Sequence, residues 1–161
     1  MGKQRNHQAM GWLLSPLLSL PLPALMPPAA TAETILSLER TSRSYPSGDL
    51  VWLLKLTDGA KQIASWQAAS GTNKSQKLDR RWSPGNGAPL PAGKYRLGPA
   101  EPFGQDLWID LQPEFDTSRS ALGIHNCFPG VGCICIPDRK ALGNLSEIIQ
   151  KLRIKTLTVV N

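Results

Sequence analysis

The sequence SALGIHNCFPGVGCICIPD, residues 120–138, is the stretch that says most about the fold and its site. It holds every cysteine of the chain, namely Cys127, Cys133 and Cys135. It also holds His125, the only histidine outside the first 32 residues. Apolar residues precede the histidine, a Pro-Gly pair follows it, and a β-branched run ends the stretch. This pattern predicts two strands joined by a turn, which we interpret as an antiparallel hairpin.

Side chains in such a hairpin alternate between its two faces. His125 and Cys127 then share a face of the first arm, Cys133 and Cys135 share a face of the second, and all four meet on one surface. A thiol whose proton is taken by an imidazole becomes a far better nucleophile. Gly132 leaves room for a substrate backbone beside Cys133, and nearby main-chain N–H groups would then stabilise an oxyanion.

Three interpretations of this cluster stay open on the residues alone. The first is a catalytic cysteine–histidine pair. The second is a metal site, although ligands only two positions apart, such as His125 and Cys127, give poor tetrahedral geometry. The third is structural: a disulfide, a spare buried thiol and a surface histidine.

The N-terminal segment, residues 1–32, has the features of a secretory signal peptide. Lys3 and Arg5 precede an apolar stretch from Gly11 to Met26, and the small-residue pattern Ala30-Thr31-Ala32 follows. We expect cleavage before Glu33, which leaves residues 33–161 as one mature domain.

The charge balance argues against nucleic acid as a partner. Lys3 and Arg5 leave with the signal peptide, so the 18 basic residues become 16 against 12 acidic ones, a net charge of +4. These charges form no basic cluster with interleaved aromatic residues. We expect a secreted or periplasmic monomer without a membrane span. Three cysteines in an oxidising compartment leave at least one thiol unpaired within the chain.

The rest of the mature chain is predicted to be mostly β. Strands are expected at residues 33–40, 49–57, 61–69, 93–97, 106–111 and 154–160. Asp58-Gly59 predicts a hairpin between two of them. Residues 98–105 are predicted to form a turn, and residues 72–91 a long loop, either a binding loop or a mobile connector.

One helix is predicted after the cysteines. Asp138 is a suitable N-cap, and Leu142, Leu145, Ile149 and Leu152 recur at helical spacing. Together with the strands this predicts a mainly β sandwich or barrel-like domain of about eight strands, with one C-terminal amphipathic helix followed by a last strand.

Tryptophans are candidates for a binding cleft. Trp66 and Trp108 lie in predicted strands and are expected to pack in the core. Trp82 lies in the long loop and is the better binding candidate.

The order of several short motifs is similar to that of the L,D-transpeptidase catalytic-domain family (YkuD-like). Gly123-Ile124-His125 followed by Gly130-Val131-Gly132-Cys133-Ile134 resembles the signature of that family. Upstream, Ser70-Gly71 and the segment Pro89-Leu90-Pro91-Ala92-Gly93-Lys94-Tyr95 stand where the family has two further motifs. The resemblance covers about Thr34 to Ile136. It implies an L,D-transpeptidase-like β-sandwich domain and a secreted enzyme that remodels peptidoglycan.

The resemblance also implies roles for individual residues. Cys133 would attack an amide of a peptidoglycan peptide stem and form a thioester, and His125 would be the base that later protonates the leaving amine. The N–H groups of Cys133 and Gly132 would form the oxyanion hole. The acyl group would then pass to an amine of another stem, or to water. Neither a cofactor nor a metal is expected.

Two positions depart from the pattern of the family. Gly130 stands where a serine or threonine is usual, and Cys135 stands where an arginine often binds a substrate carboxylate. Arg119 or Arg139 would have to replace that arginine, and each can equally be read as a solvated charge.

The extra cysteines raise a question of pairing. We predict a disulfide between Cys127 and Cys135, which leaves Cys133 free in an oxidising compartment. A Cys127–Cys133 bridge is the alternative and would silence the enzyme. Two other functions also remain open: an L,D-carboxypeptidase or endopeptidase that transfers the stem to water, and a wall-binding module without catalysis.

Overall fold

The computed structural model describes residues 33–76, 81–82, 87–128 and 132–160, which lie in one compact unit spanning residues 31–161. The predicted signal peptide, residues 1–32, and Gly130 lie outside the described residues. Within the described part of the chain, no helix has the length and apolar character needed to cross a membrane.

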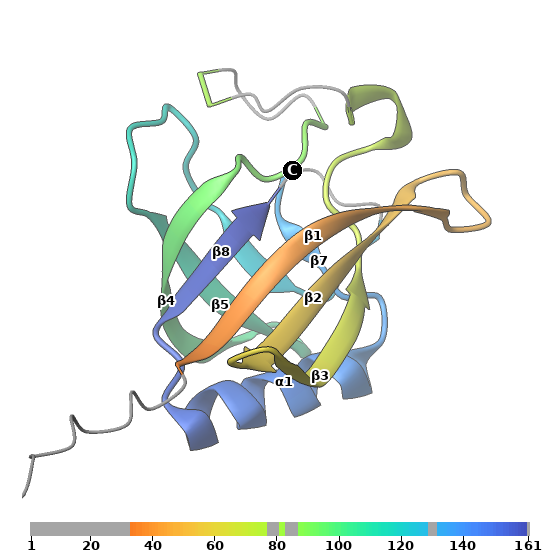
Figure 1. Cartoon of the computed structure of the whole chain (residues 1–161). Coiled ribbons are helices and arrows are strands. Elements are labelled where there is room, and N and C mark those ends of the chain that lie inside the picture. The colour runs from red at the N-terminus through yellow and green to blue at the C-terminus, as the bar shows by residue number, and fades with distance from the viewer. Residues whose placement is uncertain (1–32, 77–80, 83–86, 129–131, 161) are drawn as a thin grey trace, which may run out of the picture. The chain divides into compact units, whose positions relative to one another are not determined.

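All eight strands of the described residues belong to one sheet (Figure 1). They are β1 (Thr34–Ser44), β2 (Leu50–Asp58), β3 (Lys61–Ala68), β4 (Gly93–Phe103), β5 (Asp106–Pro113), β6 (Gly123–His125), β7 (Ile134–Cys135) and β8 (Thr156–Val160). Their order in the sheet is β3-β2-β1-β8-β4-β5-β6-β7. A short 3₁₀ helix, η1 (Asn73–Ser75), and one α-helix, α1 (Arg139–Leu152), complete the described elements.

The first three strands form the predicted meander. β1 and β2 are antiparallel, as are β2 and β3, and the β2–β3 turn contains Gly59 with a positive φ of 56°. Leu36 and Leu38 of β1 and Leu54 and Leu56 of β2 are fully buried or nearly so. The last strand, β8, pairs in parallel with β1 and antiparallel with β4, and so joins the two halves of the sheet.

Strand β4 is longer than predicted, because residues 98–103 continue the strand beyond Leu97 instead of forming a turn. The pairing with β5 shifts between Leu97 and Ala100, so an irregularity absorbs Pro99, which has no N–H for the ladder. The turn itself is Gly104-Gln105, where Gly104 has a φ of 62°. The prediction for residues 98–105 was therefore wrong in all but its last two positions.

The two edges of the sheet meet next to the cysteines. Ala69, which directly follows β3, forms an antiparallel bridge with Cys135 of β7. The two residues exchange both backbone N–H···O hydrogen bonds, each 2.8 Å long. In Figure 1 the strands accordingly curl around a common interior. The predicted mainly β fold is confirmed, with one continuous sheet that closes on itself at this point.

The predicted helix is α1, which Figure 1 shows across the end of the curled sheet. The Asp138 side chain caps it by accepting hydrogen bonds from the backbone N–H groups of Lys140 (2.8 Å) and Ala141 (3.4 Å). Such a cap contributes about 1 kcal/mol. Leu142, Leu145 and Ile149 face the core, as predicted. Leu152 is 45% exposed, because Arg153 ends the helix there in a left-handed conformation (φ 54°).

Candidate functional site

The strands that carry the candidate site are parallel. β6 and β7 pair with Ile124 opposite Ile134 and His125 opposite Cys135. The predicted antiparallel hairpin was therefore wrong. Alternating polarity identifies which side chains share a face but says nothing about strand direction. Here β7 has a second neighbour, because the backbone of Cys135 is also hydrogen-bonded to that of Ala69, and this contact sets the direction of β7.

Because β6 and β7 are parallel, Cys133 does not lie directly opposite His125. Ile124 and Ile134 are fully buried, so Cys133, Cys135 and His125 project to the opposite face. Extending the pairing by one position sets Cys133 beside Gly123, whose backbone hydrogen-bonds the thiol. Cys133 and His125 are then diagonal neighbours, with backbones about 8 Å apart, a distance that their side chains can span.

A disulfide joins Cys127 to Cys135, with 4.9 Å between their Cα atoms. Cys133 is the free cysteine of the chain. This is the pairing that we predicted, and the alternative Cys127–Cys133 bridge is absent. The bond ties the segment after β6 to β7 and fixes the chain on both sides of His125.

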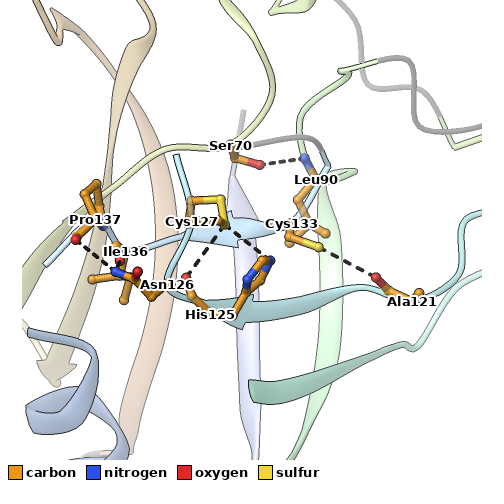
Figure 2. The surroundings of a disulfide bond; sticks show 10 residues. Ser70, Leu90, Ala121, His125, Asn126, Cys127, Cys133, Ile136 and Pro137 are labelled. Atoms are coloured by element: carbon orange, nitrogen blue, oxygen red, sulfur yellow. Dashed lines mark hydrogen bonds between the residues drawn. A yellow bond between two sulfur atoms is a disulfide. The ribbon is translucent and has the colours of Figure 1, made fainter. Parts of the chain in front are cut away.

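Cys133 is half-buried, and its thiol turns toward the backbone of Ala121 (Figure 2). It lies 3.6 Å from the carbonyl oxygen of Ala121, to which it donates a hydrogen bond. Ala121 has a φ of 51°, an uncommon conformation for a residue with a side chain. Burial raises the pKa of the Cys133 thiol, and the backbone hydrogen bond from Gly123 and the charge of Arg119 offset this only in part. At rest the thiol is therefore protonated.

The His125 imidazole lies against the disulfide and two aromatic rings. Its Nε2 is 3.2 Å from the Cys127 Sγ, and its ring centroid is 4.9 Å from that of Trp108 and 6.1 Å from that of Phe103. Burial lowers the pKa of His125, against the opposing effects of the Asn126 backbone and the Asp106 carboxylate. The imidazole is therefore neutral near pH 7 and can accept a proton.

His125 and Cys133 form a neutral pair without direct contact. In the view of Figure 2 the imidazole points up between Cys127 and Cys133, while the thiol turns toward Ala121. No hydrogen bond joins the two groups in the described structure. Rotation of the Cys133 side chain away from Ala121 is needed before His125 can take its proton. Hydrogen bonds of this kind commonly tighten only when substrate binds.

Arg119 is buried beneath the loop that carries Cys133, with only 8% of its surface exposed. Its guanidinium donates to the backbone carbonyl oxygens of Pro89 and Gly132, each at 3.4 Å. Arg119 is thus not a solvated charge. It joins two loops and places a positive charge near the thiol.

Gly132, the predicted oxyanion residue, is buried with a φ of 93°. A Cβ at this position would lie 2.2 Å from the Nη2 atom of Arg119, so only glycine allows the guanidinium to approach. Gly132 therefore serves the packing of Arg119 and uses its carbonyl oxygen for that contact.

The two upstream motifs meet on the same side of the domain. The backbone N–H of Leu90 donates to Ser70 Oγ at 2.8 Å, and a Cβ on Gly71 would lie 2.5 Å from the Pro89 nitrogen. Ser70 and Leu90 are both fully buried. Segments 70–71 and 89–90, far apart in sequence, therefore form one support for the loop of Arg119 and Cys133.

The remaining predicted substrate-binding residues lie at the surface. Trp82 is 69% exposed and follows Arg81, whose carbonyl oxygen accepts the Ser118 N–H at 3.0 Å. This hydrogen bond holds the segment of Trp82 next to the residue that precedes Arg119. Arg139 is largely exposed and forms an ion pair with Asp106, with 2.7 Å between Nε and Oδ1.

Two residues of the site were not predicted. Trp66 is in the core, as expected, but Trp108 is only half-buried and packs on His125. Gly123 permits this contact, since a Cβ there would lie 2.4 Å from the indole. A glycine next to the histidine in a strand was the available signal. Asn126 donates two 2.9 Å hydrogen bonds, to the carbonyl oxygens of Ile136 and Pro137, which no sequence pattern indicated.

One group of side chains in the described residues has the composition of a metal site. The ligand atoms of His125, Cys127 and Cys135 all lie within 4.8 Å of one another, but two of the three are joined in the disulfide.

Comparison with known proteins gives no relative: no protein-family model, curated protein or solved structure matches this chain.

Proposed function

We propose that the protein is a secreted cysteine acyltransferase that acts on peptidoglycan peptide stems, with Cys133 as nucleophile and His125 as base. One observation carries the proposal: the disulfide occupies two of the three cysteines and leaves Cys133 free on the same face of the sheet as His125. The choice of peptidoglycan stems comes from the resemblance of the motifs to L,D-transpeptidases.

The proposed reaction begins from a neutral pair. Cys133 Sγ attacks the amide carbonyl carbon of the donor stem while His125 takes the thiol proton, and the S–C bond forms. The C–N bond then breaks as His125 returns that proton to the leaving amine. An amine of a second stem attacks the thioester, loses its proton to His125, and releases Cys133 as a thiol after reprotonation.

The surroundings support this order of events. A raised pKa of the buried thiol and a lowered pKa of the buried imidazole disfavour a permanent thiolate–imidazolium pair. Proton transfer must then accompany attack. Arg119, buried near the thiol, offers positive charge where negative charge develops. Trp82 is exposed on the segment that is hydrogen-bonded to Ser118, the residue before Arg119, and is the proposed contact for the stem or its glycan.

The experiment uses the mature protein with purified muropeptides that carry a tetrapeptide stem, and mass spectrometry of the products. Cross-linked dimers are expected, together with an acyl adduct on Cys133. Cys133→Ala should reduce product formation by at least about 10⁴-fold. His125→Ala should reduce it by about 10²- to 10⁴-fold. Lys61→Gln, at an exposed position of β3, is the control and should retain activity.

The products also separate the competing functions. Shortened stems without dimers would indicate transfer to water and an L,D-carboxypeptidase or endopeptidase. Unchanged muropeptides, with binding to sacculi retained in Cys133→Ala, would indicate a wall-binding module and refute the proposal.

A further inference from the structure

The disulfide lies against an imidazole in an arrangement that its own reduction would turn into a metal-binding site. His125 Nε2 is 3.2 Å from Cys127 Sγ, and the ligand atoms of His125, Cys127 and Cys135 are mutually within 4.8 Å. A disulfide sulfur is a poor ligand, because the thiolate is the form that binds metal. The oxidised cluster therefore has one good ligand, and the reduced cluster has three.

We propose that the protein with this disulfide reduced binds one zinc ion through His125 Nε2 and the Sγ atoms of Cys127 and Cys135. A thiol or phosphine reductant supplies two electrons, and with two protons the S–S bond becomes two thiols. Zinc binding then releases both thiol protons as the two Zn–S bonds form. Zinc binding by these three residues does not require Cys133 to be a nucleophile.

One of the three distances between ligand atoms already fits a tetrahedral zinc ion, although His125 and Cys127 are only two positions apart in the chain. Zn–S bonds of about 2.3 Å and a Zn–N bond of about 2.0 Å place the two sulfurs about 3.8 Å apart and each sulfur about 3.5 Å from the nitrogen. The observed 3.2 Å from Nε2 to Cys127 Sγ is already near that value. After cleavage of the bond the two sulfurs must separate, and Cys135 Sγ, now within 4.8 Å of Nε2, must settle at the same distance from it as Cys127 Sγ. Rotations of the two cysteine side chains provide both changes.

Contacts other than the disulfide hold the three residues in place. Cys135 is fixed on one side by its two backbone hydrogen bonds to Ala69 and on the other by its pairing with His125. The backbone N–H of Ile136 donates to the His125 carbonyl oxygen at 3.0 Å. The Asn126 amide spans from the segment of Cys127 to Ile136 (Figure 2). The three ligands therefore remain close together after reduction.

The chemistry of the donors selects the metal. Two thiolates and an imidazole are the ligands of zinc and other thiophilic ions, whereas calcium and magnesium require oxygen donors. Three protein ligands leave the fourth position of the tetrahedron for water. Cys133 is outside the set, because its thiol is directed to Ala121. It therefore supplies a matched control within the same short stretch.

The test is a titration of the folded mature protein, reduced with a phosphine and freed of the reductant under anaerobic conditions. Zinc is added in competition with a chromophoric chelator, and cobalt(II) is used as a spectroscopic substitute. We expect one equivalent of zinc, and a thiolate-to-cobalt charge-transfer band with the visible bands of tetrahedral cobalt(II). The oxidised protein should show neither. Far-UV circular dichroism before and after reduction reports whether the sheet is retained.

Variants identify the ligands. Cys127→Ser and His125→Ala should each weaken zinc binding by at least about 100-fold. Cys133→Ser, which keeps both cysteines of the site, should bind as the unmodified protein does. Equal losses in Cys133→Ser and Cys127→Ser, or reduced protein that binds no more zinc than oxidised protein, would overturn the proposal. If Cys127→Ser unfolds, the comparison of reduced Cys133→Ser with its oxidised form still decides the matter.

Discussion

β1, β2 and β3 run for 11, 9 and 8 residues, whereas β6 and β7 run for three and two. The meander is held by long antiparallel ladders and by fully buried leucines such as Leu38 and Leu54. The candidate site is held by single contacts between distant segments. These are the disulfide, the β-bridge of Ala69 to Cys135, and the hydrogen bonds of the Asn126 amide and the Arg119 guanidinium. Changes in the meander should therefore affect global stability, and changes near β7 should act locally on the thiol and the imidazole.

The largest effect on stability is expected from Leu54→Ala in β2. Leu54 is fully buried, so its truncation should cost about 3 kcal/mol of unfolding free energy through lost burial and a cavity. Denaturant unfolding measures this loss, and the alkylation rate of Cys133 in the native protein should stay the same. Ile63→Ala in β3, where the side chain is 44% exposed, is the control and should change stability by less than about 0.5 kcal/mol. A changed alkylation rate in Leu54→Ala would contradict the separation of the two regions.

A smaller effect is expected when the disulfide is removed in Cys127→Ser/Cys135→Ser. The bond closes a loop with a sequence separation of 8, for which chain entropy predicts a stabilisation of about 2.5 kcal/mol. Native-state hydrogen exchange should show the amides of Ile134 and Ile136 opening more readily than those of β1 and β2. Uniform loss of protection over the whole sheet would mean that the site is not an independent region.

The smallest effects are expected in the titration of Cys133 and His125. Burial raises the pKa of Cys133, so alkylation by iodoacetamide should reach half its maximal rate above the usual value of about 8.5. Arg119→Gln removes a charge that lowers this pKa, so the midpoint should move further up. The exposed Arg139→Gln serves as control and should leave it unchanged. A midpoint below 8.5 would refute the neutral pair.

The titration of His125 should set the pH dependence on the acid side. Burial lowers the pKa of His125, so the midpoint of the imidazole titration should lie below the usual value of about 6.5. The imidazole should therefore still be neutral, and able to accept a proton, in mildly acidic solution. The rate of the proposed acyl transfer should therefore fall only below about pH 6.5, as the imidazolium forms. NMR titration of the ring protons checks the midpoint directly, and a value above 6.5 would contradict it.

The meander shows which features of the fold sequence patterns can predict. Alternating apolar residues and Asp58-Gly59 predicted β1, β2 and β3 to within a few residues, because the period of a strand and the geometry of its turn are local properties. The same holds for α1, with its Asp138 cap and its helical spacing of leucines. The end of β4 was missed, since Pro99 and Pro102 suggest a turn. The strand accommodates Pro99 at an irregularity and Pro102 beyond the residues of β4 that pair with β8.

The candidate site shows which features such patterns do not predict. The sequence by itself determined the chemistry present: three cysteines and one histidine at alternate positions of residues 125–127 and 133–135, and a mainly β chain with one helix. Only the tertiary structure decided that β6 and β7 run parallel, that Cys133 lies beside Gly123 and not opposite His125, and that Arg119 is buried near it. Strand direction and burial of a charge depend on neighbours from distant segments, here Ala69, Pro89 and Trp108, and no local pattern records those contacts.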